Sequence, residues 1–371
     1  MKIFRYVFVA LCLMLASCSP KESNDGMVET ESLTGTVMTI PEDCNMMFPI
    51  SIHNGTVISK SYNPEYHFIQ SHIRNDTLSD NIGFISFGQG PAEMLNASIA
   101  TDSSGECYVM NTSLGHAGTV YKVTDHGVLL PDDKYEVFPL DRLPAIRFTA
   151  WNFIVVDDSN IMILGDKFKD PTSVVSLIDY RRQIHKPVGF WPEDGFEGNP
   201  RCKTSAYQCN SSLVTNGKGK YLFATSESKY ATIFSIQNGK CHIDNILYNN
   251  PIRYEDASDT GELYRLLKGD SFGLKAKGTE KAIYILNLDK DFDGQPAKQI
   301  KDGHDGDCID VFDWNGKLIR KLKLDHTGYN IFIDNNDSLL YLIRTNPETG
   351  DQQLLKYSLI YIKCLLTIEA A

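Results

Sequence analysis

The sequence predicts an all-β fold, a six-bladed β-propeller with four antiparallel strands in each blade. Three observations predict it. A β-hairpin pattern occurs six times along the chain, a second pair of strands follows each copy, and one unpaired strand precedes the first copy. Four-stranded antiparallel units repeated around a channel are the blades of a propeller, and each unit buries its faces only against its neighbours.

The first pattern is an apolar run, a turn rich in Asp, Asn and Gly, and a second apolar run. Its turn centres are 49 to 62 residues apart and lie at Asn54, Ser103, Asp158, Gly217, Thr279 and Asn335. Because propeller repeats of about 40 to 50 residues are typical, we expect long connections between some of the strands.

The second pattern is a pair of strands with alternating apolar and polar residues. Its copies begin at Glu65, Gly118, Ser173, Ala231, Cys308 and Gln352. The Asn-Gly pairs at 238–239 and 315–316 are strong hairpin signals. Only residues 255–268 have a pattern that predicts a helix. A two-domain array of β-sandwiches is the alternative architecture, and the six-fold repeat argues against it.

A single strand pattern at Ser32–Ile40 precedes the first unit. We expect this strand to pair into the last blade and close the ring, so that residues 32–371 form the propeller. Closing the ring would cover an edge strand, which would otherwise present unpaired backbone groups to solvent.

The first 17 residues have the pattern of a secretory signal peptide. Lys2 and Arg5 precede an apolar run at residues 6–16, which is shorter than the roughly 20 residues that span a bilayer. The segment Leu15–Cys18 resembles the lipobox of bacterial lipoproteins. That resemblance implies cleavage before Cys18, acylation of its thiol and, because serine follows, sorting to the outer membrane. A soluble secreted protein with an incidental cysteine is the alternative.

Residues 18–31 are polar and lack aromatic side chains, which predicts a flexible lipidated tether. Removal of residues 1–17 deletes Lys2 and Arg5 and no acid, so the formal net charge changes from −11 to −13. An acidic chain of this kind has no basic surface for nucleic acid. We therefore expect membrane contact through the lipid anchor, with the protein facing either the periplasm or the exterior.

The segment Phe-Gly-Gln-Gly-Pro-Ala-Glu at residues 87–93 raises the question of phosphate binding. A dinucleotide loop needs a third glycine and a following helix, and this segment has neither. A connection between blades is the favoured interpretation, in which Gly88 and Gly90 permit unusual backbone angles, Pro91 restricts one, and Glu93 hydrogen-bonds the turn. The functional alternative is that these four residues bind a ligand at the mouth of the channel.

Four segments together resemble the TolB-like six-bladed propeller lipoproteins of Gram-negative gut commensals. They are the lipobox, residues 87–93, residues 309–325 and residues 331–344. The resemblance extends from about residue 32 to 360. This chain has Ala92 at the position where the family pattern has a second glycine. The resemblance implies the propeller fold, and it implies no established reaction.

Residues 289–296 match the first half of a calcium loop. Asp289, Asp291 and Asp293 would direct alternate carboxylates at one hard cation, and Gly294 would make the bend. The expected bidentate Glu is replaced by Ile300, so a solvated acidic turn is the competing interpretation. We expect no other cofactor, since the zinc motifs H-E-x-x-H and C-x-x-C are absent from the sequence.

Beyond Cys18, seven cysteines remain in the mature chain. The compartment permits disulfides, and Cys202 with Cys209 is the predicted pair. The segment Gly269–Gly273 matches G-x-S-x-G, but a predicted helix precedes it and a predicted strand follows. This order is the inverse of a nucleophile elbow, so no catalytic residue is assigned.

Two functions are consistent with these observations. The first is an outer-membrane-tethered, non-enzymatic lipoprotein whose propeller binds a protein or a glycan. The alternative is a hydrolase or lyase of the lactonase-like propeller type, with a site in the channel that uses calcium. The two would be distinguished by whether carboxylates from several blades converge at one mouth of the channel.

Overall fold

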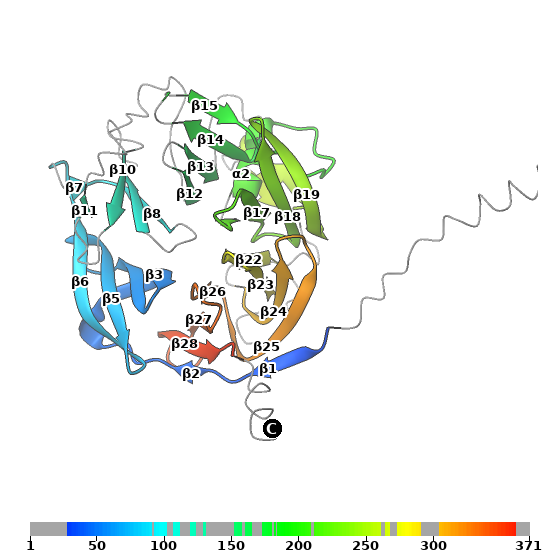
Figure 1. Cartoon of the computed structure of the whole chain (residues 1–371). Coiled ribbons are helices and arrows are strands. Elements are labelled where there is room, and N and C mark those ends of the chain that lie inside the picture. The colour runs from blue at the N-terminus through cyan, green and yellow to red at the C-terminus, as the bar shows by residue number, and fades with distance from the viewer. Residues whose placement is uncertain are drawn as a thin grey trace, which may run out of the picture.

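The chain folds as an all-β propeller in the computed structural model (Figure 1). The structure describes residues 28–90, 93–101, 107–111, 119–123, 129–130, 152–157, 160–164, 173–179, 182, 184–208, 211–260, 264–267, 273–290 and 304–360.

The first three large sheets follow the order of the chain. One contains β3 (Met46–His53), β4 (Thr56–Ser61), β5 (Tyr66–Arg74), β6 (Thr77–Phe87) and β7 (Glu93–Met94). The next contains β8 (Ala97–Thr101), β9 (Cys107–Asn111), β10 (Thr119–Val123) and β11 (Leu129–Leu130). The third contains β12 (Asn152–Asp157), β13 (Asn160–Leu164), β14 (Val175–Asp179) and β15 (Ile184–Pro187).

The remaining three large sheets complete the series. One contains β16 (Ser212–Thr215), β17 (Lys220–Ala224), β18 (Tyr230–Gln237) and β19 (Lys240–Asn249). The next contains β22 (Gly273–Gly278), β23 (Ala282–Leu288), β24 (Gly306–Asp313), β25 (Leu318–Gly328) and β1 (Thr30–Leu33). The last contains β26 (Asn330–Ile333), β27 (Leu339–Thr345), β28 (Gln352–Ser358) and β2 (Thr36–Val37).

The first strands of these sheets form the inner wall of the ring. Each first strand contacts the first strand of the next sheet, in the order β3, β8, β12, β16, β22 and β26, and β26 contacts β3 again. Among the described residues, apolar clusters fill five of the six spaces between neighbouring sheets, so most sheets are buried on both faces. The inner strands therefore surround a common axis (Figure 1).

Both predicted strand patterns are confirmed where the structure describes them. The hairpins of the first pattern are β3–β4, β8–β9, β12–β13, β16–β17, β22–β23 and β26–β27. Asn54 and Gly55 in the first of these turns have φ of 46° and 75°, as the Asn-Gly signal requires. The second pattern forms β5–β6, β10–β11, β14–β15, β18–β19, β24–β25 and β28.

The N-terminal segment joins the ends of the ring, as predicted. β2 pairs antiparallel with β28 as the fourth strand of the last sheet. β1 was not anticipated and pairs in parallel with β25 of the preceding sheet. The predicted tether is consequently too long at its C-terminal end, because Thr30 and Glu31 belong to β1.

The predicted helix at residues 255–268 is wrong. The described part of that segment forms β20 (Tyr254–Asp256), the short 3-10 helix η4 (Ser258–Thr260) and β21 (Tyr264–Leu266), with β20 and β21 paired. Tyr254, Tyr264 and Leu266 pack on a core cluster, and this packing outweighs the local helical pattern. Among the described residues, the α-helix is instead α2 (Pro200–Gln208), which follows Asn199. The Asn199 Oδ1 atom accepts a hydrogen bond from the backbone N–H of Arg201.

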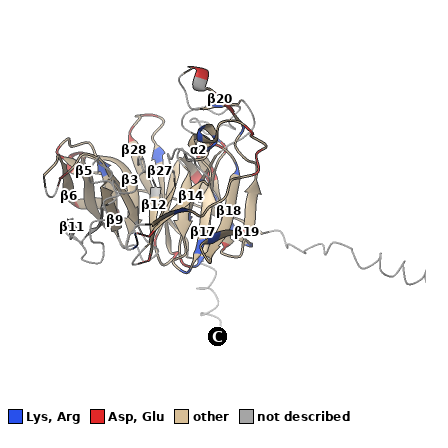
Figure 2. Ribbon diagram, turned by 90° about the horizontal axis from the view of Figure 1, so that it is seen from above, with Lys and Arg blue, Asp and Glu red and all other residues tan. Residues whose placement is uncertain are grey.

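The direction of the strands defines two faces of the ring. Where the structure describes them, the first-pattern turns lie on one, which we call the lower face. The described links between one sheet and the next lie on the other, the upper face, together with α2 and the β20–β21 hairpin. Figure 2 shows α2 and β20 on one side of the sheets. No helix among the described residues is long and apolar enough to cross a bilayer.

Candidate functional site

Exposed apolar side chains gather on the upper face of the first sheet. Phe48 lies near the start of β3, Tyr62 in the turn between β4 and β5, Phe87 at the end of β6, and Leu95 just after β7. Their exposed fractions are 40%, 65%, 49% and 44%. We call these four residues the upper patch. Clustered exposed apolar groups of this kind mark binding surfaces, and aromatic residues are enriched in them.

The loop predicted from the glycine pattern lies beside the upper patch. The Glu93 Oε2 atom accepts a hydrogen bond from the backbone N–H of Gly90 at 2.9 Å. A Cβ on Gly88 would collide with the Glu93 carboxylate, so a larger residue there would displace the Glu93 side chain. Glu93 thus closes the turn as the sequence predicted, while Pro91 lies outside the described residues. Binding of a ligand by Gly88, Gly90, Pro91 and Glu93 stays a prediction.

His67 and Met94 hold Phe87 in place within the upper patch. The rings of His67 and Phe87 have centroids 3.6 Å apart, and His67 Nε2 lies 2.7 Å from the backbone oxygen of Met94. Burial lowers the pKa of His67, so the ring is neutral near pH 7. Because Met94 is 2% exposed, it anchors the loop to the core. Phe87 is therefore exposed in a fixed orientation.

A lysine lies beneath the patch. Lys60 pairs across strands with Phe48 and Phe68, and its Nζ lies 4.5 Å from the centroid of the Phe68 ring. Burial lowers the pKa of Lys60. An ammonium over an aromatic face is stabilised by the ring quadrupole, which fixes these side chains in turn. The upper patch thus joins aromatic surface to one half-buried cation.

A second ordered region on the upper face is the cap formed by α2 and the β20–β21 hairpin. The Asp194 carboxylate accepts hydrogen bonds from Lys203 Nζ at 2.7 Å, Tyr254 OH at 2.9 Å and the Phe196 N–H at 3.0 Å. The side chain of Asp194 is 1% exposed. Trp191, Phe196 and Tyr254 surround this pair with aromatic contacts. The cap is therefore a packed extension of the fold and accounts for the long repeat there.

Among the described residues, Cys202 is a free, buried thiol. Its predicted partner Cys209 lies outside the described residues, so the disulfide between them stays a prediction. Cys202 stands in α2 and contacts the backbone oxygen of Glu255.

Asp289 follows β23 and lies on the upper face, in a different sheet from the upper patch. Its Oδ1 atom is buried without a hydrogen-bond partner among the described residues. Asp291 and Asp293 lie outside the described residues, as does Cys18. Within the described ranges, no three metal-binding side chains converge. The structure therefore brings Gly88, Gly90 and Glu93 together and leaves the calcium loop a prediction.

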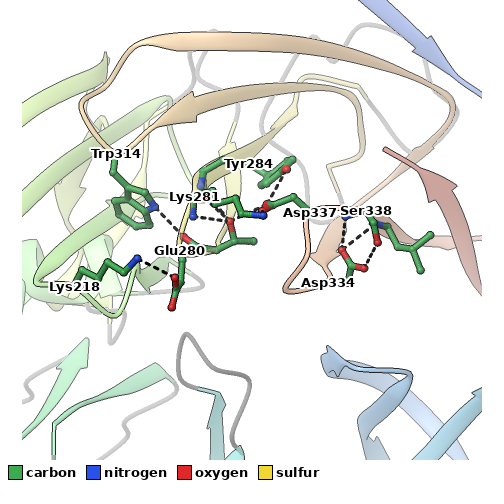
Figure 3. Close-up of polar contacts among 11 residues, drawn as sticks. Lys218, Glu280, Lys281, Tyr284, Trp314, Asp334, Asp337 and Ser338 are labelled. Atoms are coloured by element: carbon green, nitrogen blue, oxygen red, sulfur yellow. Dashed lines mark hydrogen bonds and ion pairs between the residues drawn. The ribbon is translucent and has the colours of Figure 1, made fainter. Parts of the chain in front are cut away.

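The lower face carries a network that joins neighbouring sheets (Figure 3). The Asp337 Oδ1 atom accepts hydrogen bonds from Thr279 Oγ1 at 2.8 Å and Tyr284 OH at 3.0 Å, and Lys281 Nζ lies 3.6 Å from its Oδ2. Trp314 Nε1 donates to the Thr279 backbone oxygen at 2.9 Å. These contacts hold turns together, so the lower face is structural at these positions.

The chain belongs to the TolB-like 6-blade propeller-like family, whose model matches residues 36–336. The predicted family is therefore confirmed. No curated protein matches the chain.

Solved structures with a similar chain trace include a gluconolactonase from Xanthomonas campestris, at 12% identity, 82% of each chain covered and a TM-score of 0.40. TolB from Acinetobacter baumannii has 10% identity, a TM-score of 0.41, and 82% of this chain and 63% of its own covered. An auxiliary nutrient binding protein from Bacteroides thetaiotaomicron has 8% identity, a TM-score of 0.41, and 88% and 76% covered. Similarities this low do not indicate a function for the chain.

Proposed function

We propose that the chain is a non-enzymatic binding lipoprotein, a six-bladed propeller tethered to the outer membrane through lipid on Cys18. Its upper face binds a protein or glycan partner. The upper patch is the observation that carries this proposal: three aromatic side chains are exposed, and at least Phe87 is held in place by buried neighbours. Preformed aromatic surface binds partners with little loss of conformational entropy.

The point at which the tether joins the propeller supports an orientation in which the upper face points away from the membrane. Thr30 pairs with Lys321, which lies in the first part of β25 as that strand leaves the lower face. A lipid joined through residues before Thr30 would thus leave the upper patch facing away from the membrane. Membrane fractionation and mass spectrometry of the N-terminal peptide test the anchor itself.

Replacing Tyr62 and Phe87 by alanine is expected to weaken partner binding at least tenfold. Truncating central aromatic residues of an interface commonly costs about 2 kcal/mol or more. The measurement is biolayer interferometry against a panel of polysaccharides and against envelope proteins recovered by crosslinking to the wild-type chain.

The matched control replaces Ile243 and Ile246 by alanine. Both are also exposed, at 44% and 46%, but they lie on β19 at the outer edge of another sheet. A partner that binds the Tyr62/Phe87 variant as well as the wild type would overturn the assignment of the upper patch.

The alternative function is a channel-sited, calcium-assisted hydrolase or lyase. The buried, unpartnered Oδ1 of Asp289 favours it, because such an atom would be satisfied by a cation. This alternative predicts micromolar calcium binding in calorimetry, a rise in the unfolding midpoint that a chelator reverses, and loss of both in Asp289→Asn. Absence of calcium binding by the wild-type chain would remove this alternative and leave the binding proposal intact.

A further inference from the structure

A groove opens on the lower face, between the sheet of β16 to β19 and the turn that joins β24 to β25. Its volume is about 520 Å³, within the range of about 300–1,000 Å³ that is usual for small-ligand sites. The polar side chains among its lining residues are Lys218, Lys220, Ser235, Gln237, Asp244 and Asn315. The groove therefore lies at the junction of two sheets that do not carry the upper patch.

The wall formed by the β24–β25 turn is held in place by side chains of the other sheet. Lys220 Nζ donates to the Trp314 backbone oxygen at 2.7 Å and to Asn315 Oδ1 at 2.9 Å. Asn245 Nδ2 donates to the Asn315 backbone oxygen at 3.0 Å. Gly316, with φ of 85°, permits this close approach, because a Cβ there would collide with Asn245. The groove is thus preformed, which reduces the entropy lost when a ligand binds.

Asp244 is the acid that lines the groove, and it has no counter-charge among the described residues. Its Oδ1 atom accepts a hydrogen bond from Ser235 Oγ at 3.0 Å. The two lysines are engaged, since Lys218 pairs with Glu280 at 2.9 Å and Lys220 donates to the β24–β25 turn. Because Lys220 and Asp244 have opposite charges, the groove favours neither an anion nor a cation. The Asp244 carboxylate therefore favours a neutral ligand whose hydroxyl groups donate to it.

The groups beside Asp244 suit the same kind of ligand. Gln237 is exposed, and its Nε2 atom donates to Ser235 Oγ at 3.4 Å. Its second N–H and its carbonyl oxygen make no hydrogen bond with a described residue, so this amide is able both to donate and to accept. Ile236 is the apolar side chain of the groove, and it packs on a core cluster. A sugar ring matches this combination, because it has hydroxyl groups at its edge and C–H groups on its faces.

We propose that this groove binds a neutral saccharide of one or two rings. Asp244 accepts hydrogen bonds from neighbouring hydroxyl groups of the sugar, Gln237 binds the next polar position, and a C–H face of the ring lies on Ile236. The site is separate from the upper patch, and its ligand binds whether or not a partner occupies that surface.

Titration of the mature chain with glucose, galactose, N-acetylglucosamine and maltose, followed by ligand-observed NMR, tests the proposal. We expect at least one of these sugars to bind the wild type with a dissociation constant of about 1 mM, as is usual for a small polar ligand in an open groove. Asp244→Asn should weaken that binding about tenfold or more, because it replaces charge-assisted hydrogen bonds by neutral ones. Gln237→Ala should weaken it severalfold.

Two control variants separate the groove from other causes. Asp351→Asn removes the same charge from an exposed acid between β27 and β28 and should leave sugar binding unchanged. The double alanine variant of Tyr62 and Phe87 should also bind the sugar as the wild type does. The unfolding midpoint of each variant confirms that the fold is retained.

Three results would overturn the proposal. The first is that none of the four sugars binds the wild type, and the second is that Asp244→Asn binds as tightly as the wild type. The third is loss of sugar binding in the Tyr62 and Phe87 variant with Asp244→Asn unaffected, which would assign the saccharide to the upper patch instead.

Discussion

Deleting residues 1–38 is expected to destabilise the ring by about 5 kcal/mol and to lower the midpoint of thermal unfolding by at least about 5 °C. The deletion removes β1 and β2, so β28 keeps β27 but loses its outer partner, and its edge is exposed. It also removes Met38, which is 3% exposed and donates its N–H to the Leu354 oxygen at 2.8 Å. Burial of such a side chain contributes about 1.5–3 kcal/mol.

An ion pair adds to the effect of the closing strands. Arg320 donates to both carboxylate oxygens of Glu31, at 3.0 and 2.8 Å, with both side chains about one-fifth exposed. Bidentate geometry makes this pair stronger than an ordinary surface pair. The matched control deletes only residues 1–27 and should leave the midpoint within about 1 °C of the full chain. Equal midpoints for the two deletions would contradict a closing role for β1 and β2.

The strands of the propeller were predictable because their signals are local. Asn54-Gly55 can form a tight turn from its own backbone preferences, and apolar alternation defines the flanking strands. The closing strand was predictable for a related reason, since an odd strand before a regular repeat needs a partner. β1 was missed because its pairing depends on β25, which is nearly 290 residues away in the chain.

The helix and the upper patch show where local signals fail. Asn199 before Pro200 is a helix-start signal that could have located α2. Residues 255–268, in contrast, contain Gly261 and pack on the core through Tyr264 and Leu266. Phe48 and Phe87 would be assigned to the core from their residue type. These two side chains are exposed because the start of β3 and the end of β6 both lie at the upper face of the sheet. Only the tertiary structure determines that placement.

Asp194→Asn is expected to lower the free energy of unfolding by about 3 kcal/mol near pH 7. The substitution preserves shape but leaves Lys203, whose side chain is 16% exposed, without its counter-charge at 2.7 Å. Removing one partner of a buried ion pair lowers the free energy of unfolding by more than the intact pair contributes, because the other charge then stays buried alone. Thermal unfolding and limited proteolysis of the α2 region measure the loss, and the cap should be cleaved first.

The pH dependence separates this electrostatic loss from a simple packing defect. Burial alone would raise the pKa of Asp194, but hydrogen bonds from Lys203, the Phe196 backbone and Tyr254 lower it overall. A carboxyl group with a lowered pKa stabilises the fold above its unfolded value of about 3.9, and the contribution is lost as the pH falls through the folded value. The wild type and Asp194→Asn should therefore approach equal stability below about pH 4.

An exposed pair in the same cap provides the control. Arg265 and Glu255 are each about half exposed and lie 3.4 Å apart, so Glu255→Gln should change stability by less than about 0.5 kcal/mol. If Asp194→Asn were as mild as Glu255→Gln at pH 7, the buried pair could not be what holds α2 to the propeller. The apolar contacts of Tyr254 and Phe196 would then account for the cap by themselves, and its stability would not vary with pH in this range.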